Sequence, residues 1–356
     1  MKSVLALPRI QTRYFIRDYS QKTQIFRTLF KKFWLLVLLL SAFSLPYVSG
    51  RYMTYIATLA LVTVIGSIGL NILTGCAGQI SLGHGAFLAI GAYSYTLLVS
   101  KMGLPFWLSV VAGGGISGAV GIIVGLPALR MKGLYLAMST LAFHCIIEQI
   151  IMNWESLTGG YQGLNVPVAS LGGFLFKGEI RVYYLILIFA IALTFVGGNI
   201  IRSKFGRAFA AIRDRDLAAE AIGISLTNYK LIAFFISSVY GGIAGSMMAI
   251  CLGRISPYDF TLILSIVYIS MIIVGGLGSI VGSILGALAI TLLPFGLSAA
   301  SDIIQPYYPL ISTKFADVKI MAYGITIVFF LMWEPDGLVG RWRRIKIYLK
   351  NWPFTY

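Results

Sequence analysis

The chain has 356 residues, of which 58% are hydrophobic and only 11% are charged, and its mean hydropathy is +0.87. A soluble domain usually has about 25% charged residues, so this composition excludes a soluble protein and predicts an all-α, polytopic integral membrane protein. The net charge of +16 does not indicate nucleic-acid binding, because the basic residues lie in loops and at the ends of apolar runs.

Apolar runs predict about ten membrane-spanning helices, since a helix needs roughly 20 apolar residues to cross a bilayer. They cover residues 33–49, 53–73, 84–100, 105–126, 134–152, 183–201, 231–252, 261–277, 280–298 and 320–333. Residues 33–333 are therefore expected to form one transmembrane domain, preceded by a basic arm (1–32) and followed by a basic tail (334–356). The arm has no small-residue cleavage site, so we expect it to be retained and not to be a signal peptide.

The distribution of Lys and Arg predicts the orientation. Placing both ends of the chain in the cytoplasm puts 21 of the 28 basic residues on the cytoplasmic side, six of them in the loop 202–230. The seven on the outer side are Arg51, Lys101, Lys177, Arg181, Arg254, Lys314 and Lys319. Because Lys and Arg are enriched in cytoplasmic loops, this asymmetry favours two cytoplasmic termini.

Glycines spaced four residues apart predict where spans pack closely, since lipid-embedded helices associate through small residues. The glycines in question are Gly114 with Gly118, Gly121 with Gly125, and Gly278, Gly282 and Gly286. Residues 275–278 (GGLG) indicate either a tight turn between two spans or a broken helix. The three cysteines, Cys76, Cys145 and Cys251, have no metal-ligand spacing and are interpreted as inert packing residues, so no metal site is predicted.

The loop 202–230 contains the pattern of a short amphipathic helix from Arg207 to Ile222. Its apolar positions are Phe209, Ile212, Ala219 and Ile222, and residues 213–216 (RDRD) form a charged cluster beside them. Gly206 and Gly223 bracket the helix, and Gly223 is placed as a C-terminal glycine stop. The pattern alone is compatible with docking in a groove of a partner protein or with lying on the lipid surface.

Polar residues inside spans are candidates for function because they are costly in lipid. His84 begins one span close to Gln79 and Ser81, and the three side chains either present hydrogen-bonding groups to a polar solute or pack with His84 bonded to a carbonyl. His144 and Glu148 share one helical face, with His144 about 15 Å into the bilayer. This pair is interpreted as lining a pathway, as a structural pair, or as a proton relay.

Five segments resemble the permeases of branched-chain amino acid ABC transporters of the LivM type. They are NILTGCAGQISLGHGAFLAIG (71–91), LPALRMKGLYLAMSTLAF (126–143), TGGYQGL (158–164), GRAFAAIRDRDLAAEAIGI (206–224) and PDGLVGR (335–341). They occur in family order over about 270 residues, outside the basic arm. The family also includes permeases for urea, amides and other amino acids, so the resemblance leaves the substrate open.

The resemblance implies a multi-pass permease of a bacterial inner membrane that works with a second homologous permease, two cytoplasmic ATPases and an extracytoplasmic solute-binding protein. The chain has no phosphate-binding GxxxxGK[ST] motif, so ATP is expected on partner subunits and no cofactor on this chain. The implied ATPase-coupling residues are Gly206, Arg207, Ile212, Arg213, Asp214, Ala218, Ala219 and Gly223.

The predicted outer loop 153–182 contains Trp154, Tyr161 and Pro167, and it is expected to be an ordered, turn-rich segment. The resemblance places it where a binding protein would dock, whereas the pattern alone also fits an interfacial aromatic anchor.

Two other classes of protein remain as alternatives. A secondary transporter or channel would carry more charges deep in its spans, and a membrane-embedded enzyme would need convergent catalytic groups, of which none are predicted.

Overall fold

The computed structural model describes residues 29–128, 131, 133–171, 174–304 and 337–351, together with isolated positions between 321 and 332. The chain divides into two compact units, Met1–Val48 and Ser49–Tyr356. In the first unit the described residues form one helix, α2 (Leu29–Val48). The predicted arm 1–32 lies almost entirely outside the described residues, and the run 320–333 is described at eight of its fourteen positions.

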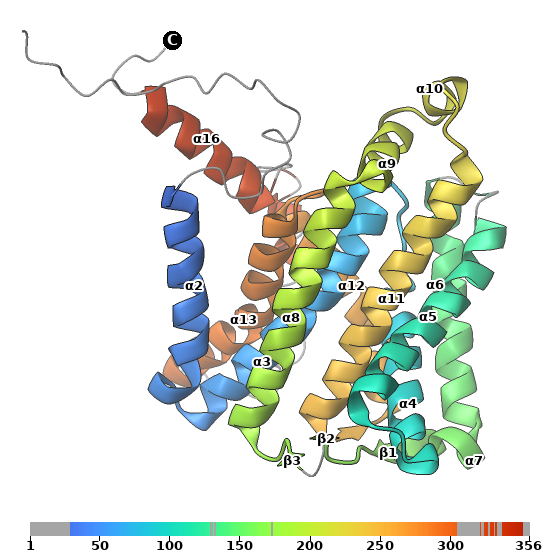
Figure 1. Cartoon of the computed structure of the whole chain (residues 1–356), viewed down its shortest axis with the longest axis vertical. Helices are drawn as coiled ribbons and strands as arrows, with labels where there is room; N and C mark the ends of the chain where they lie inside the picture. Colours follow the sequence, from blue (N-terminus) through green and yellow to red (C-terminus); the bar gives the residue numbers. More distant parts are fainter. Residues whose placement is uncertain are drawn as a thin grey trace, which may run out of the picture. The chain divides into compact units, whose positions relative to one another are not determined.

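The second unit is built mainly from long helices joined by short connections (Figure 1). The long helices are α3 (Arg51–Leu70), α4 (His84–Met102), α5 (Phe106–Ala128), α6 (Leu134–Asn153), α8 (Glu179–Arg202), α9 (Lys204–Asp214), α11 (Leu226–Leu252), α12 (Leu262–Gly275), α13 (Ile280–Ile304) and α16 (Gly337–Asn351). The short elements are the π-helix η1 (Asn71–Cys76), α7 (Glu155–Thr158), η2 (Gly160–Gln162), β1 (Leu164–Asn165), β2 (Ser170–Leu171), β3 (Phe174–Leu175), α10 (Asp216–Ala221), β4 (Arg254–Ile255) and η3 (Pro257–Phe260).

Within the described residues, seven helices are long and apolar enough to cross a membrane. The helix α4 is as long as several of these but carries His84 and Lys101 near its two ends, and α2 has a shorter apolar part, Leu36–Val48. The chain is therefore an all-α, multi-pass membrane protein, while the predicted count of about ten spans is not confirmed.

The most buried spans are α3 and α11, with 78% and 67% of their apolar stretches enclosed by the rest of the chain. The helix α11 packs against α5, α4 and α3. These contacts are close because glycines face the neighbouring backbone: a Cβ at Gly245 would meet the Leu88 carbonyl of α4, and one at Gly91 would meet the Gly242 carbonyl of α11. Lipid is as apolar as leucine, so this close backbone approach is what holds such helices together.

The predicted packing glycines mostly lie at such contacts. Gly114, Gly118, Gly121 and Gly125 of α5 face α11, and Gly282 and Gly286 of α13 face α12. Gly278 is different, because it lies in the turn between α12 and α13 with a φ of 78°. The segment 275–278 is therefore a tight turn between two helices and not a break within one.

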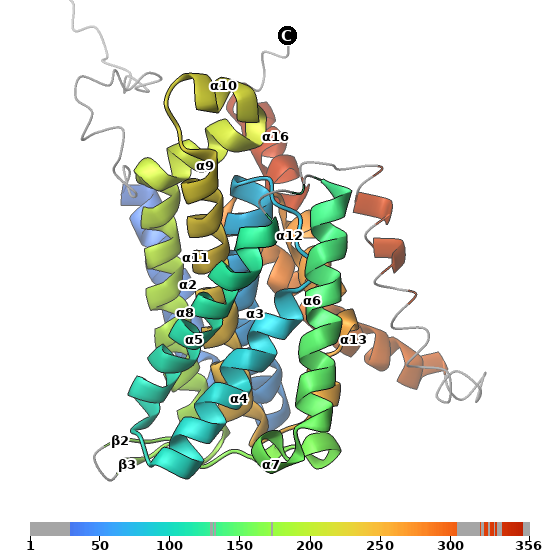
Figure 2. The same ribbon diagram turned by 90° about the vertical axis from the view of Figure 1, so that its right-hand side faces the viewer.

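The connections gather at the two ends of the second unit (Figure 2). At one end, β1 pairs antiparallel with β4, and Lys101 Nζ donates to the Ser156 carbonyl at 3.3 Å. The connection after α4, the loop 153–182 and the connection that contains β4, all three predicted on the outer side, thus lie together. At the other end lie α9, α10 and the start of α16 (Figures 1 and 2), where a Cβ at Gly337 would lie 2.6 Å from the Gly276 nitrogen. The loop 202–230 and the start of the tail, both predicted to be cytoplasmic, therefore share that end of the second unit.

Candidate functional site

The loop 202–230 forms two helices, not the single helix predicted from Arg207 to Ile222. The first, α9, ends at Asp214, and α10 begins at Asp216. Arg215 between them has an extended backbone, with φ −159° and ψ 107°. The prediction of a single helix is wrong. The spacing of the apolar residues stays close to helical across Arg215, so it does not reveal a break of one residue.

The apolar face of this segment is turned toward its own chain. Phe209 and Ile212 of α9 and Ala219 of α10 are at most 2% exposed, and the Phe209 ring lies edge-on to Tyr229 of α11. Outside the lipid, burying each of the two large side chains contributes about 1.5–3 kcal/mol. Three of the four predicted apolar positions are therefore covered by the chain itself, and of the predicted face only Ile222 is open to a partner.

A different apolar pair is exposed at the tip of the loop. Leu217 is 78% exposed and Ile222 75% exposed, on α10 and just after it. Ala218, Asp214 and Arg215 are also exposed there. Large exposed apolar side chains beside charges are typical of a protein-docking surface. We call Leu217, Ala218 and Ile222 the loop tip.

Two predicted glycines shape this loop. A Cβ at Gly206 would collide with the Ile201 carbonyl at the end of α8, so only glycine lets α9 fold back so sharply from α8. Gly223 has a φ of 85°, and the Gly223 and Ile224 amides donate to the Glu220 and Ala219 carbonyls. This is a Schellman motif, so the predicted glycine stop is confirmed.

Arg213 connects the loop to the transmembrane helices. Its Nη1 donates to the Gly75 carbonyl at 2.8 Å, across 138 residues of sequence, while its Nε lies 3.6 Å from Oδ1 of Asp214. Gly75 belongs to η1, the π-helical end of α3. Such π-turns are frequent at functional sites. The guanidinium therefore ties α9 to the end of a buried span.

The same π-helix holds the α12–α13 turn through Asn71. The Asn71 amide donates to the Ser279 carbonyl at 2.9 Å and to Ser283 Oγ at 2.7 Å, and its Oδ1 accepts the Gly278 amide at 2.8 Å. Arg213 and Asn71 together link three segments that lie far apart in the sequence.

Asp216 and Lys230 form a second tie, between α10 and α11. Lys230 Nζ lies 3.0 Å from Asp216 Oδ2, and the Lys230 side chain is only 5% exposed. Arg207 Nη1 donates to the Arg202 carbonyl at the end of α8 at 3.4 Å. The loop is thus bonded to α8 through Arg207, to the π-helical end of α3 through Arg213 and to α11 through Asp216.

Inside the spans, His84 lies at a junction of three helices. Its Nε2 is 2.9 Å from the Gly66 carbonyl of α3, and its ring lies edge-on to Tyr268 of α12, with ring centroids 5.1 Å apart. His84 is 1% exposed. This is the carbonyl-bonded arrangement that the sequence left open beside solute contact.

His144 and Glu148 of α6 share a face, with His144 Nε2 3.9 Å from Glu148 Oε2. His144 Nδ1 also lies 3.4 Å from Ser265 Oγ of α12, and that oxygen accepts the Gly85 amide at 2.8 Å. We call His84, His144, Glu148, Ser265 and Tyr268 the polar cluster. It joins α4, α6 and α12 within the membrane-spanning part of the chain.

Gln79 and Ser81 bond within their own loop. Gln79 Nε2 donates to the Ala77 carbonyl at 3.3 Å, and Ser81 Oγ accepts the Gly83 amide at 3.4 Å. The residues that sequence reasoning missed are Asn71, Leu217, Lys230 and Ser265, and Asp216 was noted only as part of the charged cluster 213–216. Asn71 is the one with a detectable signal, since it is a lone amide at the end of an apolar run.

The long apolar helices and the buried glycine contacts between them define the class as an all-α, multi-pass membrane protein. A family model described as "Branched-chain amino acid transport system / permease component" matches residues 52–331. The chain belongs to this family.

Curated relatives agree with the family match. The chain is 31% identical to the high-affinity branched-chain amino acid transport system permease protein LivM of Salmonella typhimurium, over 88% of this chain and 76% of the relative. It is 30% identical to LivM of Escherichia coli, over 91% and 78%. It is also 25% identical to LivH of Salmonella typhimurium, over 80% and 93%. No solved structure matches the chain significantly.

Proposed function

We propose that this chain is the permease subunit of an ATP-driven importer that carries branched-chain or related amino acids, or urea or amides, across a bacterial cytoplasmic membrane by alternating access. The family match over residues 52–331 and relatives named for branched-chain amino acid transport support this proposal. The chain binds no ATP in this scheme. A second homologous permease, two cytoplasmic ATPases and an extracytoplasmic binding protein complete the importer.

The observation that carries the ATP-driven mechanism is the attachment of the loop tip to the spans. The loop tip exposes Leu217 and Ile222 to a partner. Asp216 beside it is paired with Lys230 of α11, and Arg213 is bonded to the π-helical end of α3. An ATPase that moves α10 would therefore pull on α11 and α3, the two most buried spans.

The proposed orientation puts α9, α10, α16 and both termini in the cytoplasm, following the excess of basic residues at that end. The opposite end, with β1, β4 and α7, would then face the binding protein. Tyr161 and Tyr258 lie there with their ring centroids 6.4 Å apart, and both are exposed. Exposed aromatic side chains are common in protein-docking surfaces.

The test replaces both large apolar residues of the loop tip, Leu217→Asp with Ile222→Asp, in a tagged chain expressed with its natural partners. We expect the ATPases to be lost from the complex that is purified in mild detergent, because two carboxylates would enter an apolar contact. The matched control is Tyr161→Asp, an exposed residue at the other end of the molecule, which should leave ATPase recovery unchanged. Mass spectrometry of the purified complexes gives the readout.

Uptake by proteoliposomes distinguishes this function from secondary transport. The complex containing ATPases should take up radiolabelled leucine or urea only with ATP and the binding protein. Uptake by the chain alone, without ATP, would instead identify a secondary transporter or channel.

A further inference from the structure

The helix α16 has large apolar side chains that the described part of the chain leaves exposed. Trp342 is 65% exposed, Ile345 45% and Tyr348 57%. They follow one another at intervals of three residues, so they lie along one side of the helix. We call these three residues the apolar stripe. Leu338, one turn before Trp342, packs against the core of the second unit, so the stripe continues the side of α16 that begins in the core.

The amphipathic helix α9, at the same end of the second unit, shows how an apolar face is covered when the chain itself supplies the contact. Phe209 and Ile212 are at most 2% exposed, and the Phe209 ring lies against Tyr229 of α11. The apolar stripe of α16 has no such cover among the described residues. Whatever covers the stripe in the membrane therefore lies outside this part of the chain.

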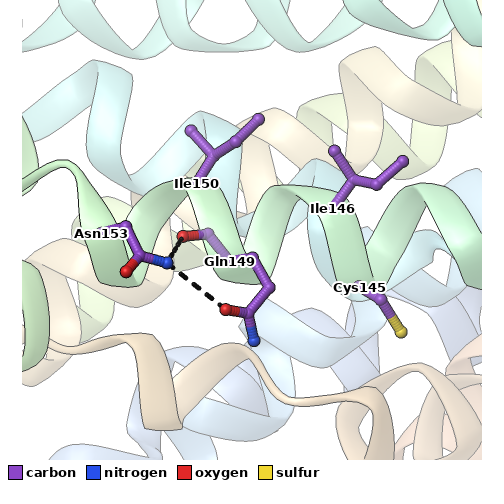
Figure 3. Close-up of a pocket in the computed structure, with 5 residues that line it drawn as sticks. All are labelled: Cys145, Ile146, Gln149, Ile150 and Asn153. Carbon is purple, nitrogen blue, oxygen red and sulfur yellow. Dashed lines mark hydrogen bonds between the residues drawn. The ribbon is translucent and has the colours of Figure 1, made fainter.

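The exposed face of α6 is a different case, because it belongs to a span. A shallow hollow runs along it (Figure 3), lined by Cys145, Ile146, Gln149, Ile150 and Asn153. None of these five side chains is charged, and the Asn153 amide donates to the Gln149 carbonyl at 2.8 Å and to Gln149 Oε1 at 3.3 Å (Figure 3). The chemistry of this face indicates no particular occupant, whereas that of α16 does.

The charge of α16 has one sign. Residues 337–356 contain five basic residues and no acidic ones. The basic residues are Arg341, Arg343, Arg344, Lys346 and Lys350. At about 100° per residue, Arg341 and Lys346 flank the apolar stripe on its two sides. Long basic side chains can keep their charged ends among lipid headgroups while their stems cover apolar surface. This combination is typical of a helix that lies in the interface of an anionic bilayer.

The start of α16 is fixed at the ends of two spans. A Cβ at Gly337 would lie 2.6 Å from the Gly276 nitrogen, so α16 begins against the turn between α12 and α13. It contacts both of these helices and then leaves them obliquely (Figure 1). Because a span ends where the hydrocarbon of the bilayer ends, α16 begins at the level of the lipid headgroups.

We propose that α16 lies on the membrane surface at its end of the second unit, with the apolar stripe at the edge of the acyl chains and its basic residues bound to the phosphate groups of anionic phospholipids. This contact would hold the α12–α13 turn at the membrane surface. The arm 1–28 does not fit the same face, because it carries six basic residues and one acidic residue and like charges repel. The proposal goes beyond the proposed function and does not depend on it.

The test uses the full chain, together with the proteins that co-purify with it, in nanodiscs of phosphatidylcholine with or without phosphatidylglycerol. The three natural cysteines are replaced, and a fluorophore is attached at Ile345→Cys. Lipids that carry a nitroxide near the headgroup quench the fluorophore on contact. We expect quenching when phosphatidylglycerol is present and roughly fivefold weaker quenching without it, because each basic residue near an anionic surface contributes about that factor to binding. High salt should weaken the quenching as well.

The matched control is Leu217→Cys, which lies at the same end of the second unit and is 78% exposed, but beside Asp214 and Asp216. A fluorophore there should show little quenching in either lipid. A second variant combines Arg341→Gln, Arg343→Gln and Lys346→Gln with the labelled position 345. Since glutamine is as good a helix former as lysine and arginine, this variant keeps the helix and should lose the dependence on phosphatidylglycerol.

Three results would overturn the proposal. The first is an absence of quenching at position 345 when phosphatidylglycerol is present. The second is equal quenching in both lipids and in the glutamine variant, which would show that the basic residues do not recognise anionic lipid. The third is quenching in the chain purified alone but not in the complex with its partners, which would assign the apolar stripe to a protein.

Discussion

Single side chains carry the link between the loop and the membrane-spanning helices. Arg213 reaches the Gly75 carbonyl, Asn71 holds the α12–α13 turn through three hydrogen bonds, and Lys230 is paired with Asp216. Each contact joins segments that belong to different helices. A residue in such a position can be essential for coupling without contributing to the docking surface.

Replacing Arg213 with Gln should separate coupling from docking. The variant loses a charge-assisted bond to Gly75 on a side chain that is 46% exposed. We expect the contact between α9 and the end of α3 to be weakened by about 1 kcal/mol. ATP-driven uptake should then fall roughly fivefold, while recovery of the ATPases is unchanged. Uptake by proteoliposomes and ATPase recovery measure the two effects separately.

The control for this variant is Arg215→Gln, which makes the same change of charge at an exposed position in the break between α9 and α10. It should leave the uptake per bound ATPase unchanged, because in the described part of the chain Arg215 has no bond to the spans that the substitution would remove; any effect should be on ATPase recovery. Loss of the ATPases from the Arg213 variant would show instead that Arg213 belongs to the docking surface.

At the scale of elements, the protein depends on close contacts between helix backbones. The helix α11 meets α4 through Gly91, Gly242 and Gly245, and it meets α5 through the glycines of α5. In lipid there is little hydrophobic force between helices, so such contacts supply much of the packing energy. The amphipathic α9 is the opposite case, because burial of Phe209 and Ile212 holds it against the chain.

Replacing Gly245 with Ala should destabilise the contact between α4 and α11. The added methyl group would collide with the Leu88 carbonyl, a backbone atom that cannot turn aside. We expect a cost of about 1–3 kcal/mol, seen as a lower thermal midpoint and a smaller monodisperse fraction in size-exclusion chromatography. The control is Gly115→Ala on α5, where nothing lies within 4 Å of the added methyl group. Equal effects of both substitutions would contradict this packing.

At the scale of the whole molecule, the second unit gathers different elements at its two ends. One end gathers α9, α10 and the start of α16, and the other gathers α7 and the short strand pairs (Figure 2). The polar cluster lies within the spans between them. This division predicts that the ends face different compartments.

Cysteine labelling tests that division. In a chain whose three natural cysteines are replaced, a membrane-impermeant thiol reagent should label Tyr161→Cys in intact spheroplasts. It should label Leu217→Cys only after the membrane is permeabilised, because the excess of basic residues keeps the loop inside. The two positions are 57% and 78% exposed, so access to the side chain limits neither reaction. The reverse pattern would invert the orientation, and labelling of both in intact cells would place both ends outside.

Composition and local pattern alone predicted the helical membrane class, most helix bounds, the packing glycines and the stop at Gly223, because each depends on residues close together in the sequence. The interpretation of Cys145 as a packing residue was wrong within this chain, since its side chain is exposed. An apolar residue in a helix can be recognised from the sequence, but what covers it cannot. This holds for any amphipathic helix, since its period shows that one face is apolar but not what covers that face.

Only the tertiary structure decided which apolar residues of the loop are buried and which are exposed. Phe209 and Ile212 are covered by the chain itself, whereas Leu217 and Ile222 remain exposed. It likewise decided that Arg213 bonds to Gly75 and that His84 lies against Tyr268. The last two contacts join residues more than a hundred positions apart, and local sequence carries no information about which distant atom a side chain will reach.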